Sequence, residues 1–415
     1  MTFTNRNTTL SPWRFVTAFG TISLLADFVY EGARSITGPL LASLGATAFI
    51  VGIVTGVGEA AALLLRLVSG PLTDRTQRFW AWTIAGYALT VITVPVLGLT
   101  ATLWVACTLV IAERVGKAIR SPAKDTLLSF ATAAVGRGRG FAVHEALDSI
   151  GGIIGPLVVA GMLALTGGHY GPALGVLAAP GVAVLALLAW LRLRVPEPAV
   201  YEPIPAHIDT LATETGTGTG TKSRQTRWWA AMPRDFWLYA TFTAITVAGF
   251  ATFGVLSFHM VARGIVPAAA VPLIYAAAML SGAAAALATG WAYDRNGPRV
   301  LIALPVLSIA IPALGFSTHT WGVIGGALLW GAALGIQEST LRAVVADLVA
   351  PARRASAYGL YAAVLGVATA AGGTVTGYLY EHSITALIAT VALVQVLGAI
   401  FFLITTARRR RTTPR

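Results

Sequence analysis

Charged residues are scarce in this sequence. Asp, Glu, Lys and Arg together make up 11% of the 415 residues, whereas hydrophobic residues make up 56% and the mean hydropathy is +0.74. A soluble domain usually carries about 25% charged residues. So few charges could not cover the surface of two soluble domains, which the length alone would allow. The composition therefore excludes that class and predicts an outer surface that faces lipid.

Cysteine and the common catalytic motifs are lacking as well. The one cysteine, Cys107, lies in an apolar run, which excludes a disulfide framework within the chain and is typical of packing. The sequence has no phosphate-binding loop, nucleophile elbow or metal-ligand spacing. We therefore expect no enzyme, no metal site, no bound cofactor and no ATP-driven pump.

Long apolar runs fill most of the chain. A membrane-spanning helix needs roughly 20 mostly apolar residues, whereas the strands of a membrane barrel alternate over about ten. The runs here are too long and too rich in Gly, Ala and Leu to be such strands. They predict an all-α integral membrane protein with twelve transmembrane helices, at 14–42, 45–71, 79–100, 102–129, 140–167, 171–194, 235–262, 268–292, 299–317, 321–348, 355–380 and 383–406.

Basic residues mark every second connection between these runs. The basic stretches are at 74–78, 136–140, 294–299, 351–355 and, in the tail, 408–411. The other connections have almost no basic residues, with Arg263 as the exception. This asymmetry predicts a multi-pass protein of the cytoplasmic (inner) membrane with both termini in the cytoplasm. The net charge of +12 then lies near anionic headgroups, and because it is spread over short loops we expect no nucleic-acid partner.

A polar, low-complexity stretch divides the chain in two. Residues 196–233 are rich in Pro, Thr and Gly and include the run TGTGTGT at 215–221. This composition predicts a flexible cytoplasmic linker. It would join an N-terminal six-helix bundle, residues 1–195, to a C-terminal six-helix bundle, residues 234–415.

Similar motifs close the second segment of each half, GPLTDRTQR at 70–78 and GWAYDRNGPR at 290–299. Two six-helix halves with a repeated loop motif resemble the major facilitator superfamily, whose transporters bind substrate between the halves. Gln77 and Phe79 depart from the family's loop signature, which has a Gly and a second basic residue there. The residues that fit it are Gly70, Asp74, Arg75 and Arg78 in the first copy, and Gly290, Asp294, Arg295 and Arg299 in the second.

The resemblance implies a conformational latch at these loops. In the family, the acid pairs with an arginine of a neighbouring helix in one conformation and releases it in the other. The alternative is that these are ordinary solvated charges in tight turns.

A second resemblance lies in the fifth segment, at GGIIGPLVVAG, residues 151–161. Gly151, Gly155 and Pro156 fit the Gly-rich stretch of the family's drug/proton antiporters, although the paired glycines after the Pro are missing. Plain helix packing is the alternative, since small residues four apart let helices approach closely. The runs ERVGKAIRSPAKD and HEALDSIGGIIGP also resemble bacterial and archaeal superfamily members without an established substrate.

The run at 113–125 places a charged stripe inside an apolar segment. Glu113, Lys117, Arg120 and Lys124 fall on one helical face, with Arg114 at least a quarter turn away. Charged residues within a bilayer face the bundle interior or a water-filled cavity and pair there. We therefore expect Arg120 to pair with an acid of the first or second segment, with Glu31 as first choice and Glu59 as second.

Other ionisable side chains of the apolar segments belong to the same predicted charge network. Acids and bases nearly balance in the N-terminal half, so a network that mostly neutralises itself is the alternative to substrate binding. The second half offers an apolar, aromatic wall, which would suit an amphipathic solute or simply pack. The network candidates are Tyr30, Arg34, Glu59, Arg66, Glu113, Arg114, Lys117, Arg120, His144, Asp148, Glu338 and Arg342.

Asp27 and Glu31, one turn apart in the first segment, are the candidate proton-coupling residues. With the resemblance above, they favour a secondary transporter that works by alternating access and uses a proton gradient to export small amphipathic molecules. We expect it to be a monomer. One alternative is a carrier of organic anions or metal complexes held by Arg34, Lys117 and Arg120. The other is a membrane sensor or scaffold that does not transport.

Overall fold

The computed structural model describes residues 10–201, 232–349 and 354–412, and within these ranges it is helical without strands. The N-terminal half contains α1 (Pro12–Ser43), α2 (Ala48–Leu64), α3 (Arg66–Thr76), α4 (Phe79–Leu97), α5 (Leu103–Val135), α6 (Arg137–Leu165), α7 (Tyr170–Gly175), α8 (Ala178–Arg194) and η1 (Pro198–Tyr201). The C-terminal half contains α9 (Arg234–Ala248), α10 (Phe253–Ala262), η3 (Ala268–Ala270), α11 (Val271–Asn296), η4 (Gly297–Ile302), α12 (Ala303–Gly315), α13 (Thr320–Leu348), α14 (Arg354–His382) and α15 (Ile384–Thr412).

The apolar helices confirm the all-α membrane architecture. Among the described residues, 9 helical stretches are long and apolar enough to cross a membrane. Two long helices outside that set, α1 and α5, each carry several of the interior charges. The stretch Ala268–Gly315, counted once, contains both α11 and α12. The number of twelve spanning helices stays a prediction.

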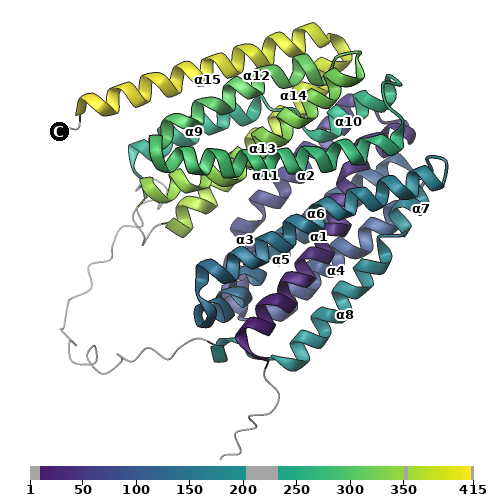
Figure 1. Ribbon diagram of the computed structural model, residues 1–415, viewed down its shortest axis with the longest axis vertical. Helices are drawn as coiled ribbons and strands as arrows, with labels where there is room; N and C mark the ends of the chain where they lie inside the picture. Colours follow the sequence, from purple (N-terminus) through teal and green to yellow (C-terminus); the bar gives the residue numbers. More distant parts are fainter. Residues whose placement is uncertain (1–9, 202–231, 350–353, 413–415) are drawn as a thin grey trace, which may run out of the picture.

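The helices of the two halves form two groups, which Figure 1 shows in purple to teal and in green to yellow. The groups meet where α2 packs along α14, where α1 packs on α10 and where α6 packs along α11. That each group is an independent bundle stays a prediction. The predicted linker falls mostly on residues 202–231, which lie outside the described part of the chain.

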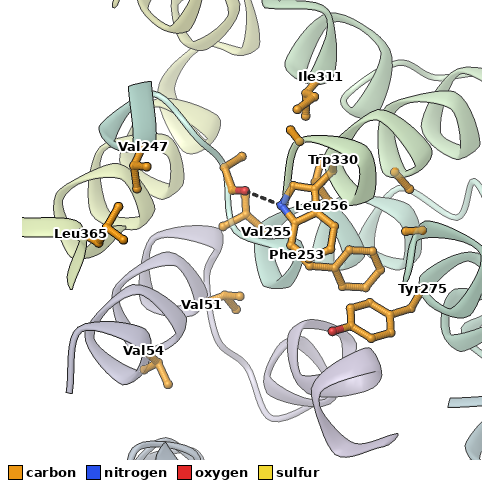
Figure 2. Packing of buried hydrophobic residues seen from close by; sticks show 14 of the residues in the cluster. Val51, Val54, Val247, Phe253, Val255, Leu256, Tyr275, Ile311, Trp330 and Leu365 are labelled. Carbon is orange, nitrogen blue, oxygen red and sulfur yellow. Dashed lines mark hydrogen bonds between the residues drawn. The ribbon is translucent and has the colours of Figure 1, made fainter. Parts of the chain in front are cut away.

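The predicted segment 235–262 matches one candidate span, Arg234–Ala262, but it is not one continuous helix. It is broken between α9 and α10, where residues 249–252 leave the helical conformation. Free carbonyl groups at membrane depth need donors from other helices. The Trp330 indole donates to the Ala251 carbonyl at 2.9 Å (Figure 2), and the Gln395 amide donates to the Thr246 carbonyl at 2.8 Å. Donors from α13 and α15 therefore stabilise the break.

The two halves meet closely at the end of the molecule where α1 turns into α2. A Cβ atom at Gly38 or Gly52 would collide with the carbonyl oxygens of Gly254 or Gly373 in the opposite half. The backbone N–H of Phe49 donates to the Glu381 carboxylate of α14 at 2.6 Å. A carboxylate from one half therefore caps the first turn of a helix in the other.

Glycines also set the contact between α1 and α6 within the N-terminal half. A Cβ atom at Gly151 would collide with the Leu24 carbonyl, and one at Gly155 with the Phe28 carbonyl. Pro156 follows directly inside α6. The three residues with antiporter resemblance therefore lie where α6 presses on the backbone of α1, which is the packing that small residues permit.

We expect Gly155→Val to reduce the yield of folded protein, because the new side chain cannot fit against the α1 backbone. Overpacking of this kind costs roughly 1–3 kcal/mol. The measurements are the monodisperse fraction and the unfolding temperature of detergent-purified protein. Gly161→Val is the matched control, since nothing lies within 4 Å of a Cβ atom added there. Equal losses in the two variants would contradict this packing.

Candidate functional site

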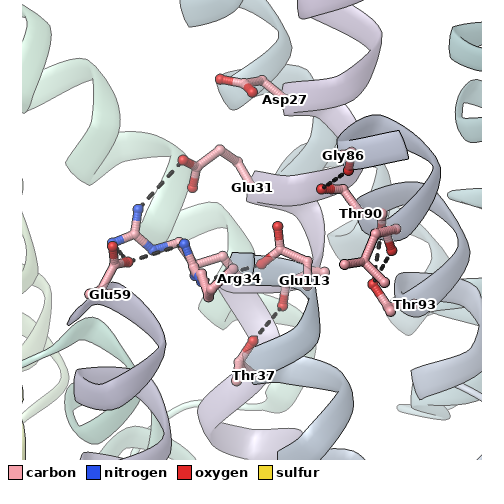
Figure 3. A network of polar contacts seen from close by, with 12 residues as sticks. Asp27, Glu31, Arg34, Thr37, Glu59, Gly86, Thr90, Thr93 and Glu113 are labelled. Carbon is pink, nitrogen blue, oxygen red and sulfur yellow. Dashed lines mark hydrogen bonds and ion pairs between the residues drawn. The ribbon is translucent and has the colours of Figure 1, made fainter. Parts of the chain in front are cut away.

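Five charged side chains from three helices form what we call the arginine–carboxylate network. Glu31 and Arg34 come from α1, Glu59 from α2, and Glu113 and Arg114 from α5 (Figure 3). Glu59 Oε1 lies 2.9 Å from Arg34 Nη2 and 3.1 Å from Arg114 Nη1, so one carboxylate holds two arginines. Arg34 also lies 3.5 Å from Glu31, and Arg114 Nε lies 3.2 Å from Glu113 Oε2.

The paired side chains of the network are largely buried. The side chains of Glu113 and Arg114 are 9% and 8% exposed, and that of Arg34 is 18% exposed. A buried charge is tolerated when a partner and further hydrogen bonds compensate for lost water. The interior therefore contains charges that neutralise one another, as the near balance of acids and bases predicts.

The ring of Tyr30 lies among three cations of this region. The Lys117 ammonium is 4.1 Å from the ring centroid, and the guanidinium carbons of Arg114 and Arg34 are at 4.4 Å and 5.9 Å. Tyr30 itself is 1% exposed. Cations are attracted to the face of an aromatic ring within about 6 Å, so Tyr30 orders the positive groups of α1 and α5.

The predicted partner of Arg120 was wrong in identity but correct in location. Arg120 Nη2 lies 3.9 Å from Asp27 Oδ1 on α1, and neither Glu31 nor Glu59 is its ion-pair partner. The reason is direction: α1 and α5 run antiparallel. Residues further along α5 therefore meet residues earlier on α1.

The predicted stripe on α5 faces the interior, and Arg114 joins it there. Glu113 and Arg120 are buried and Lys117 and Lys124 are half-buried, as expected. Arg114, which the helical projection placed off the stripe, lies at the centre of the network instead. Its long guanidinium side chain reaches around the helix, which a projection of Cα positions does not capture.

The remaining network candidates lie at varying distances from this centre. His144 is buried on α6 and Asp148 is half-buried one turn later, where Lys124 and Arg120 act on both electrostatically. Glu338, exposed on α13, attracts Arg34 from the opposite half. Arg66 is half-buried at the start of α3. The side chain of Arg342 lies outside the described residues.

Tyr275 belongs to the aromatic wall predicted for the C-terminal half, but its contact with an acid of the N-terminal half was not predicted. Its hydroxyl donates to Glu31 Oε2, so α11 of the C-terminal half contacts the charge network of the N-terminal half. Phe253 and Trp330 pack on its ring, with centroids at 4.6 Å and 6.1 Å, and Figure 2 shows the hydroxyl pointing away from them. The sequence places Tyr275 in an aromatic wall, but no pattern marks it as the member that reaches an acid.

The charged latch residues lie on the surface. Asp74, Arg75 and Arg78, and in the second copy Asp294, Arg295 and Arg299, are all exposed. Gly70 and Gly290 precede them inside α3 and α11. Among the described residues, no ion pair within 4.0 Å involves these six charged side chains. Their role as a latch stays a prediction.

Gln77, which stands where the family has a glycine, adopts a backbone conformation that is strained for a residue with a side chain. It follows α3 with a φ of 54°, in the left-handed region that favours glycine. Its side-chain amide donates to the Asp74 carbonyl at 2.7 Å, which stabilises the turn locally. A glycine would adopt this conformation without strain.

Comparison with known proteins identifies the family. The sequence profile of the Major Facilitator Superfamily matches residues 21–337 and 266–415. The chain belongs to this superfamily. An uncharacterized protein of Mycobacterium tuberculosis strain H37Rv is 62% identical over 391 residues, covering 94% of this chain and 92% of that protein. An uncharacterized MFS-type transporter of Methanocaldococcus jannaschii is 23% identical over 375 residues, covering 88% of each.

Solved structures of superfamily transporters share the fold. The nucleoside transporter NupG superposes with a TM-score of 0.69 at 17% identity, covering 94% of this chain and 98% of that one. A POT family transporter in complex with 5-aminolevulinic acid gives a TM-score of 0.72 at 13% identity, covering 97% of each. The superfamily and its fold are those of a membrane transporter with a small-molecule substrate.

We expect Arg120→Leu to lower the yield of folded protein, because Asp27 would lose its cation. Removing one partner of a buried pair costs roughly 3–5 kcal/mol. Adding Asp27→Asn should restore much of the loss, whereas Glu31→Gln should not. Folded yield and unfolding temperature measure the effect. Rescue by Glu31→Gln, or additive losses with Asp27→Asn, would contradict the pairing.

Proposed function

We propose that this protein is a proton-coupled secondary transporter that exports small amphipathic molecules by alternating access. The observation that carries the proposal is the hydrogen bond from Tyr275 to Glu31. It joins the charged network of one half to the aromatic wall of the other.

Glu31 can link proton binding to the contact between the halves. As a carboxylate it accepts from Tyr275 and pairs with Arg34. Hydrogen bonds to an ionised acceptor are roughly twice as strong as neutral ones. A proton on Glu31 would weaken both contacts and so favour the conformation in which the halves are apart. Asp27, one turn earlier and paired with Arg120, is the second candidate proton site.

The chemistry of the two sides supports an amphipathic substrate. The N-terminal side presents Arg34 and Glu59, both partly exposed. The C-terminal side offers the half-buried ring of Phe250, which stacks on the buried Trp330, and the exposed carboxylate of Glu338. A solute with one polar and one apolar end matches this division.

An organic-anion carrier is the second candidate, and Lys117 favours it. Within the described residues, Lys117 makes no ion pair within 4.0 Å, and its ammonium rests on the Tyr30 ring. Arg34 and Arg120, the other cations considered, already have acidic partners. Lys117 is therefore the cation best placed to take a carboxylate or phosphate group.

Reconstitution into liposomes tests the proposal. An imposed pH gradient would be combined with labelled lipophilic cations, organic anions and metal chelates, and both uptake and proton flux would be recorded. Gradient-driven uptake of lipophilic cations with proton counterflow supports the proposal, and uptake of anions alone supports the second candidate. Neither uptake nor proton flux across the panel would favour a sensor or scaffold.

We expect Tyr275→Phe to shift the protein toward the conformation in which the halves are apart. The substitution keeps the ring that packs on Phe253 and removes only the hydroxyl. A hydrogen bond to a charged group contributes roughly 1.5–3 kcal/mol, which corresponds to a roughly 10- to 150-fold shift in the equilibrium. The measurement is the distance between spin labels at the α3–α4 and α11–η4 turns as pH is lowered.

Tyr378→Phe is the matched control. Its ring also contacts the opposite half, at 6.0 Å from Phe49, and that contact needs no hydroxyl. It should keep the wild-type pH response. A Tyr275→Phe variant with the same pH response as the wild type would contradict a role for this bond in coupling.

A further inference from the structure

A small cavity lies inside the N-terminal half, between α1, α4 and α5. The centre of a water molecule can occupy about 20 Å³ of this cavity. Its polar lining comes from Tyr30, Arg34, Thr37, Thr93, Glu113 and Arg114, and the rest of the lining is aliphatic.

Besides Arg114 Nη1, which lies 3.1 Å from Glu59 as an ion pair, two buried polar atoms of the lining have no hydrogen-bond partner among the described residues. They are the Tyr30 hydroxyl and Glu113 Oε1, the carboxylate oxygen that does not face Arg114. Buried polar groups are nearly always satisfied, and each exception calls for a partner such as a bound water. Both residues are more than nine-tenths buried.

The cavity matches one water molecule in size and in chemistry. A site needs roughly 10–15 Å³ of such volume and two to four polar partners to hold a water. Thr37 and Thr93 donate their hydroxyl protons to backbone carbonyls at 3.0 Å and 2.7 Å, which leaves their oxygens free to accept. A water here can accept from Tyr30 and donate to Glu113 and a threonine.

We infer that this cavity is a water site and that Glu113 is a proton-carrying carboxyl reached through that water. The inference rests on the proposed proton coupling and adds a third acid to it. Glu31 and Glu59 both pair with Arg34, whereas Glu113 pairs through Oε2 with Arg114 and its Oε1 has no hydrogen-bond partner among the described residues, in a side chain that lines the cavity. A protonated Glu113 would donate its O–H to the water, and the water would donate onward to a threonine.

The charges that face Glu113 come from three helices. On its own helix these are Arg114, Lys117 and Arg120, which stabilise the carboxylate. Glu31 of α1 and Glu59 of α2 repel it. The cavity lining contributed by α4 is uncharged, with Thr93 as its polar member.

Protonation of Glu113 would change the ion pairs that lead to the contact between the halves. Arg114 would lose its charged partner and depend on Glu59 alone, which also holds Arg34. Arg34 in turn pairs with Glu31, the acceptor of Tyr275. Successive contacts of 3.2, 3.1, 2.9 and 3.5 Å therefore join the water site to that contact.

Infrared difference spectroscopy on the full chain in lipid nanodiscs tests the inference without a substrate. Spectra at acidic and alkaline pH would be compared for a protonated-carboxyl band. We expect Glu113→Gln to lose one such band and Tyr30→Phe to shift it. The control Asp125→Asn, which removes an exposed acid of the same helix, should leave it unchanged. A Glu113→Gln spectrum with every wild-type band would overturn the inference.

A second variant keeps the test decisive if Glu113→Gln does not fold. Thr37→Val with Thr93→Val preserves shape and removes two water partners while Glu113 stays. We expect the carboxyl band to shift and its exchange in D₂O to slow, and an unchanged band would overturn the inference. The liposome assay separates the two proposals, because gradient-driven uptake with an unchanged band refutes only the role of Glu113.

Discussion

The carboxylate of Glu59, shared by Arg34 and Arg114, is the interaction on which the N-terminal half depends. On insertion scales, placing a charged side chain at the centre of the bilayer costs roughly 2.5–3.5 kcal/mol of free energy. Here α1 and α5 each bring an arginine that only a second helix can fully compensate. The contact therefore fixes the register of α1, α2 and α5 as well as the electrostatics of the site. Any movement of one of these helices must carry the others along or leave a charge without its partner.

The C-terminal half satisfies the polar backbone at its break between α9 and α10 with neutral hydrogen-bond donors, Trp330 and Gln395, instead of ion pairs. Its rings pack on one another, so it offers a stiff apolar wall opposite an ionic one. The hydrogen bonds that join the halves near their centre are few, such as Tyr275 to Glu31 and Thr55 to Thr252 at 2.9 Å.

Helix positions could be read from the sequence, but partners could not. Hydropathy places the predicted segment 14–42 within two residues of α1 at either end. It misses the break at 249–252, because averaging over a segment hides a few unwound residues. The face of α5 follows from helical periodicity, yet Asp27 as the partner of Arg120 depends on the direction in which α1 and α5 pack. Tyr275 meets Glu31 from 244 residues away, a contact that no local pattern encodes.

If the proposed proton coupling holds, the balance of charge around Tyr30 would link the charge of the substrate to the direction of coupling. Three acids, Glu31, Glu59 and Glu113, face three cations, Arg34, Arg114 and Lys117. One added proton leaves the group with a positive charge. A cationic substrate group would then compete with the proton, and competition for one site gives exchange across the membrane. An anionic group would instead bind better after the proton, and by linkage each would raise the affinity of the other. The charge of the cargo would therefore decide between export against protons and movement together with them.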